Sequence, residues 1–302
     1  LAGHSGVPAE VDRDSLRRVF ASGFIPAPRS FYRAVSKLPR GHWMAFEVDR
    51  TGDVTVRRHW QFEIETDHAL ASRPEESLAE ELRHLLERAV ERRLMSDVPL
   101  GIFLSGGIDS SAVLAYAAKH MPAGSVHTFS IGFHEPSFDE SAHARAVASH
   151  FGTQHHEEML GIDRARDMTP EVLGRLDEPF GDPSIVPTYL LCEFARRRIT
   201  VALGGDGGDE LFAGYDPFKA LAAARWFRRL TPGWLRGGIR SLAEMLPVAD
   251  GNMGLDFKIK RGLRGASQPP NLWNPVWLGP LEPGEIAELF REVSPIVSFN
   301  KN

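Results

Sequence analysis

The chain has 302 residues, of which 42% are hydrophobic and 25% charged, and its formal net charge at pH 7 is −5. This composition excludes a disordered chain, and the length allows more than one domain. The charge gives no general attraction to nucleic acid or to an anionic membrane, and no apolar run approaches the ~18 residues that a membrane-spanning helix needs. The single cysteine, Cys192, excludes an internal disulfide. We therefore expect a cytoplasmic protein that binds neither nucleic acid nor membrane.

The first region of the chain extends to about Phe62. It contains one short amphipathic helix at residues 12–23 and two segments in which apolar and polar residues alternate, at residues 42–49 and 54–62. Alternation with a period of two predicts β-strands, here joined by a turn at residues 50–53. The prediction is a β-hairpin without a complete domain around it.

A polar linker at residues 63–74 separates this region from a second domain, which we expect to occupy residues 75–302. Ser72 and Glu75 have the spacing of a capping box, in which each side chain bonds to the backbone of the other at a helix start. Leucines then recur at helical spacing on one face of the helix that follows.

From residue 98 onward, strands and helices alternate. Predicted strands lie at residues 98–104, 125–133 and 200–205, and the main predicted helices lie at residues 110–120, 139–150 and 185–198. Ser137 and Glu140 form a second potential capping box. Repeated β-α-β units with continuous apolar strands predict an α/β fold built on a doubly wound parallel sheet, whose ligands bind at the carboxyl ends of the strands.

Three turns rich in glycine or serine fall at those strand ends: LSGGIDSS at residues 104–111, FSIGF at 129–133 and LGGDGGDE at 203–210. The first lacks the lysine of the common P-loop. Its glycines still let the backbone approach an anion closely, its serines supply hydroxyl donors, and the following helix presents free N–H groups. This combination predicts a phosphate site; the residues are Ser105, Gly106, Gly107, Ser110 and Ser111.

Asp109 needs a separate explanation, because a carboxylate repels phosphate. A Mg²⁺ ion between Asp109 and the phosphates would remove the repulsion. Asp206, Asp209 and Glu210 are further carboxylates that could face the same crevice. The alternative is structural: the glycines make tight turns, and Asp109 and Asp209 are helix N-caps.

The motifs LSGGIDSS, FSIGF, SFDE and LGGDGGDELFAGY together resemble the synthetase domain of the glutamine-hydrolysing asparagine synthetases, which belong to the ATP-pyrophosphatase group. Residues 24–43 and 56–62 resemble the last part of the N-terminal glutaminase domain of that family. The motif SGG-x-DS alone is shared with other members of this group, such as GMP synthetase and tRNA-modifying ligases. The motif GGDGGDELFAGY narrows the resemblance to the asparagine synthetases.

The resemblance implies an adenine nucleotide alpha hydrolase-like fold in residues 75–302, preceded by a β-hairpin remnant of an N-terminal-nucleophile glutaminase domain in residues 1–62. The family's glutaminase nucleophile is an N-terminal cysteine, and Cys192, inside a predicted helix, cannot take that place. Such enzymes also continue through further helices. We expect the chain to be an internal fragment. The sequence leaves open whether the protein forms a homodimer.

The resemblance also implies roles for individual site residues. Ser105, Gly106, Gly107, Asp109 and Ser110 would hold the pyrophosphate of ATP, while Leu104, Ile131, Gly204 and Gly205 would contact AMP. Mg²⁺ would bind Asp109 and Asp209. Asp206 would serve the adenylate intermediate as the catalytic residue; the family often has the longer Glu at this position, which puts its reach in question and allows a different acceptor.

The implied activity is an ATP-dependent ligase that converts a carboxylate, first of all the aspartate side chain, into acyl-AMP and then into an amide with ammonia from glutamine. An amidotransferase acting on a sugar or polysaccharide carboxylate, a β-lactam-forming relative, and a nucleotide-binding module without turnover are the alternatives. Product analysis and pyrophosphate release distinguish them.

For two other features of the sequence, a structural explanation is favoured over a binding site. Residues 155–158, HHEE, alternate between two faces if they form a strand, which disfavours a metal site. Residues 219–240 and 258–264 are rich in Arg and Lys, with Trp226 and Trp234 between them. We expect solvated helix faces there in preference to a surface for polyanions.

Overall fold

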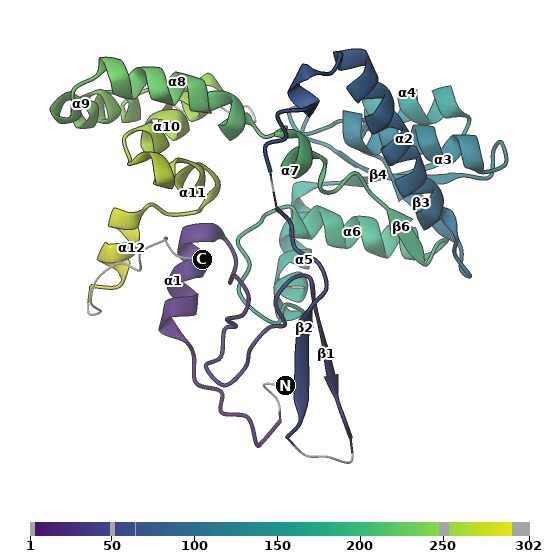
Figure 1. The fold of residues 1–302 in the computed structure, drawn as a ribbon, viewed down its shortest axis with the longest axis horizontal. Helices are drawn as coiled ribbons and strands as arrows, with labels where there is room; N and C mark the ends of the chain where they lie inside the picture. The colour runs from purple at the N-terminus through teal and green to yellow at the C-terminus, as the bar shows by residue number, and fades with distance from the viewer. Residues whose placement is uncertain (1–3, 49–51, 64, 248–253, 292–302) are drawn as a thin grey trace.

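The computed structural model describes residues 4–48, 52–63, 65–247 and 254–291. It contains a sheet domain, residues 75–212, and a helical subdomain, residues 216–289, with an N-terminal segment between them (Figure 1). The turn predicted at residues 50–53 lies partly outside the described residues.

The sheet domain is built on four parallel strands in the spatial order β5-β4-β3-β6. The strands are β3 (Leu100–Phe103), β4 (His127–Phe133), β5 (Gln154–Leu160) and β6 (Val201–Leu203). Successive strands are added on one side of β3 until β5, and β6 then pairs with the other side of β3. The order therefore reverses between β3 and β6, and the predicted parallel sheet is confirmed.

Helices cover both faces of this sheet, as the apolar strands require (Figure 1). On one face, Ile102 of β3 and Leu114 of α3 are fully buried in a core completed by α2 and α4. On the other face, Phe129 of β4 packs against Phe194 of α6. The helices of this domain are α2 (Glu75–Leu94), α3 (Ile108–His120), α4 (Ser141–Phe151), α5 (Ile162–Gly174), α6 (Ile185–Arg196) and α7 (Gly208–Phe212).

Both predicted capping boxes are wrong. Ser72 ends a short 3₁₀ helix (Leu70–Ser72), where its hydroxyl donates to the carbonyl of Ala69, and Pro74 is the N-cap of α2. Helix α4 begins at Ser141, and Ser137 does not cap it. Instead, Asp139 accepts a hydrogen bond from the Ser141 N–H at 3.1 Å.

The N-terminal segment contains the predicted helix and hairpin. Helix α1 (Arg13–Ser22) has Asp12 as its N-cap and ends at Gly23, whose φ is 82°. Strands β1 (His42–Phe46) and β2 (Val54–Arg58) pair antiparallel, and both are shorter than predicted. The hairpin projects from the molecule (Figure 1).

Apolar side chains of the hairpin remain exposed. Met44 pairs with Val56 and Phe46 with Val54, and all four are between 48% and 64% exposed. The hairpin therefore presents an exposed apolar surface.

The N-terminal segment contacts both other parts of the molecule. Helix α1 packs against α11 (Trp273–Leu278) and α12 (Pro283–Leu289) of the helical subdomain, with Phe20 edge-on to Phe290. On the other side, the Gly181 N–H donates to the carbonyl of Gly23. The domain boundaries at residues 62 and 75 stay a prediction.

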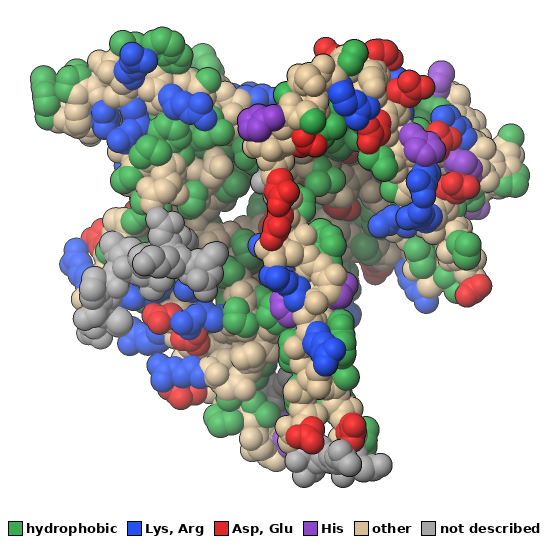
Figure 2. All heavy atoms as spheres, in the orientation of Figure 1, with side chains coloured by type: hydrophobic (Ala, Val, Ile, Leu, Met, Phe, Trp, Pro, Cys, Tyr) green, Lys and Arg blue, Asp and Glu red, His purple; other side chains and the backbone are tan. Residues whose placement is uncertain are grey.

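The helical subdomain has a small core that includes Trp273 and Trp277. Its other elements are α8 (Asp216–Leu230), α9 (Gly233–Glu244), α10 (Leu255–Ala266) and a 3₁₀ helix (Pro270–Leu272). Trp234 on α9 is 82% exposed, and Figure 2 shows hydrophobic side chains along this edge of the molecule. Among the described residues, no helix combines the length and the apolar character needed to cross a membrane.

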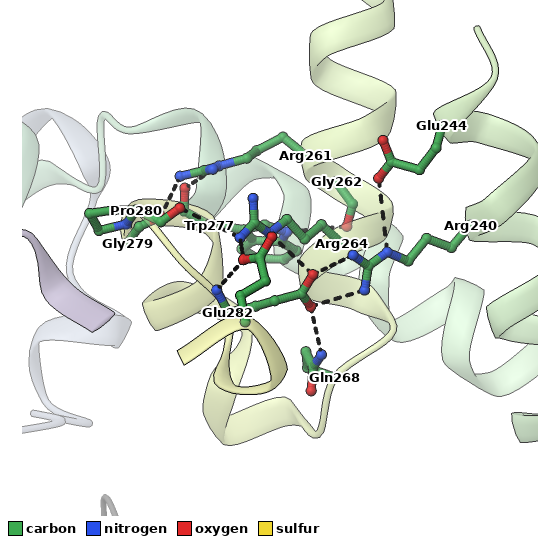
Figure 3. Close-up of polar contacts among 11 residues, drawn as sticks. Arg240, Glu244, Arg261, Gly262, Arg264, Gln268, Trp277, Gly279, Pro280 and Glu282 are labelled. Carbon is green, nitrogen blue, oxygen red and sulfur yellow. Dashed lines mark hydrogen bonds and ion pairs between the residues drawn. The ribbon is translucent and has the colours of Figure 1, made fainter. Parts of the chain in front are cut away.

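Several arginines of the helical subdomain form internal contacts, so the prediction of solvated faces is wrong for them. Arg240 on α9 donates to both carboxylate oxygens of Glu282, which is 6% exposed and also contacts Arg264 on α10 (Figure 3). Arg261 donates to the carbonyl oxygens of Trp277 and Gly279 at 2.9 and 2.7 Å. These bonds connect α9 and α10 to the segment that contains α11 and α12.

Candidate functional site

The carboxyl-terminal part of β4 and the loops that follow β3 and β6 line one cavity of about 540 Å³. The predicted convergence of LSGGIDSS, FSIGF and LGGDGGDE is therefore confirmed. The cavity lies at the carboxyl ends of the strands, beside the β3–β6 reversal, where ligands of doubly wound sheets bind. Its volume falls within the range of small-molecule sites.

The loop after β3 is organised around two serine hydroxyls. The Oγ atoms of Ser105 and Ser110 are 3.0 Å apart, and the Gly107 N–H donates to Ser105 Oγ at 3.2 Å. Helix α3 begins directly afterwards, and its N-cap, Gly107, makes no side-chain capping bond. The first turn of α3 therefore presents N–H groups without a side-chain cap at the edge of the cavity, which favours an anion there.

Gly106 and Ser111 are the two predicted site residues that do not line the cavity. The φ of Gly106 is +83°, a conformation that other residues rarely adopt, and a β-carbon placed on it would be 2.6 Å from the backbone of His143 and Ala144. Gly106 thus lets the loop reverse tightly against the start of α4.

The loop after β6 packs directly on the start of α3. A β-carbon at Gly205 would be 2.7 Å from the backbone nitrogen of Ser110, and one at Gly208 would be 2.4 Å from the carboxyl carbon of Asp109. These close approaches place the Asp109 carboxylate against the second loop. The two glycine-rich motifs therefore form one continuous wall.

Ten of the eleven residues to which the resemblance assigns a role line the cavity: Leu104, Ser105, Gly107, Asp109, Ser110, Ile131, Gly204, Gly205, Asp206 and Asp209. Leu104 is 2% exposed, and its N–H donates to the carbonyl of Phe129 on β4. The Asp206 side chain turns back over the end of β6, since a β-carbon at Gly204 would be 2.5 Å from Asp206 Oδ2. The ligands assigned to these residues stay a prediction.

The alternative that Asp109 and Asp209 are helix N-caps is wrong. Gly107 and Gly207 occupy the N-cap positions of α3 and α7, and the two aspartates lie in the first turns of these helices. Neither carboxylate has a hydrogen-bond or ion-pair partner among the described residues. Two carboxylates on one cavity fit Mg²⁺, which typically binds one or two carboxylates together with substrate phosphates. No group of three or more His, Cys, Asp or Glu residues in the described ranges could hold a metal by itself.

Tyr215 and Glu210 form a hydrogen-bonded pair on the same cavity. The sequence analysis named Glu210 only as a carboxylate that could face the crevice, and it did not name Tyr215. The Tyr215 hydroxyl donates to Glu210 Oε1 at 2.6 Å. This bond, together with partial burial and the charges of Glu210 and Asp209, raises the pKa of Tyr215 to about 12. The pair joins residues five positions apart, a relation that no helical or strand periodicity would have indicated.

The remaining wall comes from the start of α4 and from α6. Asp139 connects the end of β4 to α4 by accepting from the N–H groups of Phe133 and Ser141, and these bonds, that of Ser141 first, lower the pKa of Asp139. Helix α6 contributes Pro187 and Thr188. Helix α6 corresponds to the helix predicted at residues 185–198, but none of its residues was predicted as part of the site.

The HHEE segment forms part of β5, and its two histidines point to opposite faces, as predicted. His155 bonds to the hydroxyls of Thr128 and Ser130, whereas His156 lies 3.1 Å from a ring nitrogen of His127 and stacks on Phe129. Burial lowers the pKa of both His155 and His156. These contacts give both rings structural partners.

Cys192 lies inside α6, as predicted. Although the residue is exposed, partial burial of its thiol raises the pKa of Cys192. Because the thiolate is the nucleophilic form, a raised pKa makes this cysteine a poor nucleophile.

Comparison with known proteins finds asparagine synthetases among the relatives of this chain. The asparagine synthase family profile matches residues 81–270. A putative glutamine-hydrolysing asparagine synthetase of Methanocaldococcus jannaschii is 38% identical over 68% of this chain and 39% of its own length. Asparagine synthetase 1 of Bacillus subtilis is 30% identical over 79% of this chain and 36% of its own length. The chain therefore spans well under half of these relatives. A solved NH3-dependent NAD synthetase of Campylobacter jejuni is 13% identical, with a TM-score of 0.34, covering 72% of this chain and 98% of its own.

Proposed function

Because the chain belongs to the asparagine synthase family, we propose that its cavity binds ATP and that it takes part in an ATP-dependent, amide-forming ligase reaction. The observation that carries the proposal is the convergence of three strand-end segments on one cavity, with a serine-rich, uncapped helix start on one side and carboxylates on the other. Leu104, Ile131, Gly204 and Gly205 would contact AMP. The pyrophosphate would be held by Ser105, Gly106, Gly107, Asp109 and Ser110.

In the first step, a carboxylate oxygen of the acceptor attacks the α-phosphorus of ATP. The bond between the α-phosphorus and its bridging oxygen to the β-phosphorus breaks, and pyrophosphate leaves with that electron pair. The products are an acyl-AMP and pyrophosphate. The Ser105 and Ser110 hydroxyls and the first N–H groups of α3 would stabilise the negative charge that develops on the leaving pyrophosphate.

Asp109 and Asp209 would hold Mg²⁺, which would neutralise phosphate charge when bound. The support is their position on one cavity and their lack of a cationic partner among the described residues. Asp109 lies against the phosphate loop, so its carboxylate needs such a counter-charge before ATP can enter.

In the second step, ammonia attacks the carbonyl carbon of the acyl-AMP, and AMP leaves with the carboxylate oxygen that joined it to the acyl group. The attacking nitrogen loses a proton, and Asp206 would accept it. Proton transfer to a placed base typically contributes about 10²–10⁴-fold to a rate. Asp206 lines the cavity beside Gly205, close to the AMP contacts proposed above.

Ammonia would come from glutamine through a glutaminase domain, of which residues 1–62 would be the last part. The exposed apolar pairs Met44–Val56 and Phe46–Val54 support this, because they form a surface suited to cover by more protein.

The test is pyrophosphate release from Mg-ATP by the full-length protein with aspartate and ammonium, followed by mass analysis of the product. Asparagine, AMP and pyrophosphate in equal amounts are expected. ATP turnover only with uronic acids or other sugar carboxylates would favour the polysaccharide amidotransferase, and ATP binding without any pyrophosphate release would favour a binding module.

A further inference from the structure

One surface of the helical subdomain combines exposed apolar side chains with positive charge. We call it the α8–α9 surface, and its apolar side chains are Trp226, Leu230, Trp234, Leu242 and Met245, which are between 61% and 82% exposed. Single exposed apolar side chains are ordinary, whereas a group of large ones marks an interaction site. Figure 2 shows hydrophobic side chains along this edge of the molecule, with Lys and Arg side chains beside them.

The five apolar side chains follow the helical period on both sides of the turn that joins α8 to α9. Trp226 and Leu230 are four residues apart at the end of α8 and are therefore neighbours on its surface. Trp234 lies in the first turn of α9, and Leu242 and Met245 recur on the same face of that helix. Together they form an apolar stripe along the helix pair.

The opposite faces of the two helices pack against the rest of the subdomain. Ala224 of α8 and Ala243 of α9 are buried, and Arg240 donates to the carboxylate of Glu282. The inner faces therefore account for the fold of this subdomain. The stripe lies on the outer faces, where the described part of the chain leaves it open to solvent.

The charge of the α8–α9 surface is positive, although the whole chain carries a formal net charge of −5. No Asp or Glu occurs in residues 217–243, whereas Lys and Arg occur at six positions there: Lys219, Arg225, Arg228, Arg229, Arg236 and Arg240. A net charge summed over the chain does not reveal such a local excess. The expectation that the protein does not bind an anionic membrane rested on that sum.

Four of these arginines keep their charge without an acidic partner among the described residues. Arg228 and Arg236 donate to backbone carbonyls, which satisfy their N–H groups but do not cancel their charge. Arg225 is exposed. The guanidinium carbon of Arg229 lies 6.0 Å from the centre of the Trp226 ring, so positive charge borders the apolar stripe directly.

This combination fits the headgroup region of an anionic membrane. Trp favours the boundary between water and lipid, because its ring is apolar and its N–H is polar. Leu and Met side chains can enter the acyl-chain boundary, while guanidinium groups attract anionic headgroups. Among the described residues, no helix could cross a membrane, so the surface would lie on the membrane without spanning it.

Two other partners fit the surface less well. A nucleic acid would pair its phosphates with the arginines and stack bases on Trp226 or Trp234, but it offers no apolar cover for Leu242 or Met245. A second copy of the chain, joined by a two-fold axis through this surface, would place the same uncompensated arginines opposite each other.

We propose that the α8–α9 surface binds an anionic membrane, with its apolar stripe in the headgroup region and its arginines on the acidic lipid headgroups. The inference goes beyond the ligase reaction and does not depend on it, because none of the residues of the surface lines the cavity.

The experiment is co-sedimentation of the full-length protein with vesicles of phosphatidylcholine, alone or with about 30% phosphatidylglycerol. Binding to the anionic vesicles is expected, and it should fall about 10-fold when NaCl is raised from about 0.1 to 0.5 M. Trp234→Glu and Leu242→Glu should each lower the partition coefficient about 10-fold or more, because each removes an apolar contact and adds a charge that anionic lipids repel.

A double variant separates the charge from the apolar contacts. Arg225→Gln combined with Arg229→Gln should weaken binding to anionic vesicles about 10- to 30-fold and leave the weaker binding to neutral vesicles unchanged. Ile162→Glu is the matched control, because it adds the same charge at an 86% exposed position of α5, outside the surface. It should bind like the wild type, and circular dichroism checks that every variant folds.

No binding of the wild type to anionic vesicles, or equal binding by the wild type and Trp234→Glu, would overturn the inference. If the wild type ignores vesicles but forms a dimer that Trp234→Glu abolishes, the surface is an interface between two copies. If it ignores vesicles but binds single-stranded DNA, the surface recognises nucleic acid. Either result would replace the membrane as the partner.

Discussion

Carboxylates occur in two contrasting settings in this molecule. In the cavity, Asp109, Asp206 and Asp209 have no cationic partner among the described residues. In the helical subdomain, Glu282 is 6% exposed and contacts Arg240, Arg264 and Gln268 (Figure 3).

The difference separates a binding role from a structural one. Removing a carboxylate from water is unfavourable unless its charge is compensated, and the Glu282 cluster supplies that compensation from its own chain. The cavity carboxylates stay partly in water and leave their charge available to a ligand. We therefore expect variants of the cavity carboxylates to lower activity with little loss of stability. Variants of the Glu282 cluster should lower stability with little direct effect on activity.

The largest effect is expected for Asp206→Asn in the full-length protein. Loss of the proton acceptor should slow amide formation by about 10²–10⁴-fold while ATP binding is retained, because only the second step needs the base. Single-turnover measurements of pyrophosphate and amide separate the steps. Asp163→Asn, on the surface of α5, is the control. An equal, mild effect on both steps would return Asp206 to a structural role.

Glu282→Gln should destabilise the fold by about 3 kcal/mol, since it removes the buried carboxylate charge that Arg240 and Arg264 share and leaves them only Glu244 and Glu285 as ionic partners. Denaturant unfolding measures this, and Glu171→Gln, which breaks only an exposed pair with Arg175, should cost under about 1 kcal/mol. A similar small cost for both variants would contradict the distinction between the two settings.

The stability of the wild type and the stability of Glu282→Gln should depend differently on pH. Burial alone would raise the pKa of Glu282, but the hydrogen bond and charge of Arg240 and the charge of Arg264 outweigh burial and lower the pKa. A depressed pKa contributes stability that is present above the unfolded value, about 4.3, and is lost as the pH falls through the folded value. The stability gap between wild type and Glu282→Gln should therefore be full near pH 6 and narrow below about pH 4. A constant gap would show that the charge of Glu282 is not involved.

The next comparison tests the shape of the loop that follows β3. Gly106 and Gly124 have φ values of +83° and +73°, but a β-carbon would collide with α4 only at Gly106, and nothing lies within 4 Å at Gly124. Gly124→Ala should cost about 1–2 kcal/mol from backbone strain, and Gly106→Ala about 1–3 kcal/mol more. Thermal unfolding of both variants checks this, and equal costs would mean that α4 yields to the new methyl group.

The smallest effect is expected for Cys192→Ala. Its thiol lies on α6 with a raised pKa, so amide formation by residues 1–302 should depend on added ammonium, rise with pH as free ammonia increases, and be unchanged in the variant. Glutamate release from glutamine that disappears in Cys192→Ala would show that this cysteine is a nucleophile after all.

The sequence predicted those parts of the site that depend on local chain geometry. The apolar strand, the small residues and the helix start are consecutive in LSGGIDSS, and the parallel sheet then requires its three strand-end segments to meet. Glu210 was named as a carboxylate that could face the crevice, but its bond to Tyr215 depends on the left-handed turn at Ala213. An alanine in the sequence does not indicate a left-handed conformation.

Predictions failed where the hydrogen-bond partner of a side chain does not follow from the spacing of residues in the sequence. Ser72 had the spacing of a cap, yet its hydroxyl bonds to Ala69 and Pro74 begins the helix. Arg240 and Arg261 were expected to be solvated helix residues, but their partners lie 42 and 16 residues away in the sequence, a separation that periodicity cannot indicate.

The central claim is that the cavity promotes attack of an acceptor carboxylate on the α-phosphorus of ATP. Aspartate labelled with ¹⁸O in its side-chain carboxylate tests this directly in the full-length protein with Mg-ATP and ammonium. The attacking oxygen stays with phosphorus when ammonia displaces AMP, so one labelled oxygen should appear in AMP and none in pyrophosphate. Formation of ADP with the label in inorganic phosphate would contradict the account, because the carboxylate would then have attacked the γ-phosphorus.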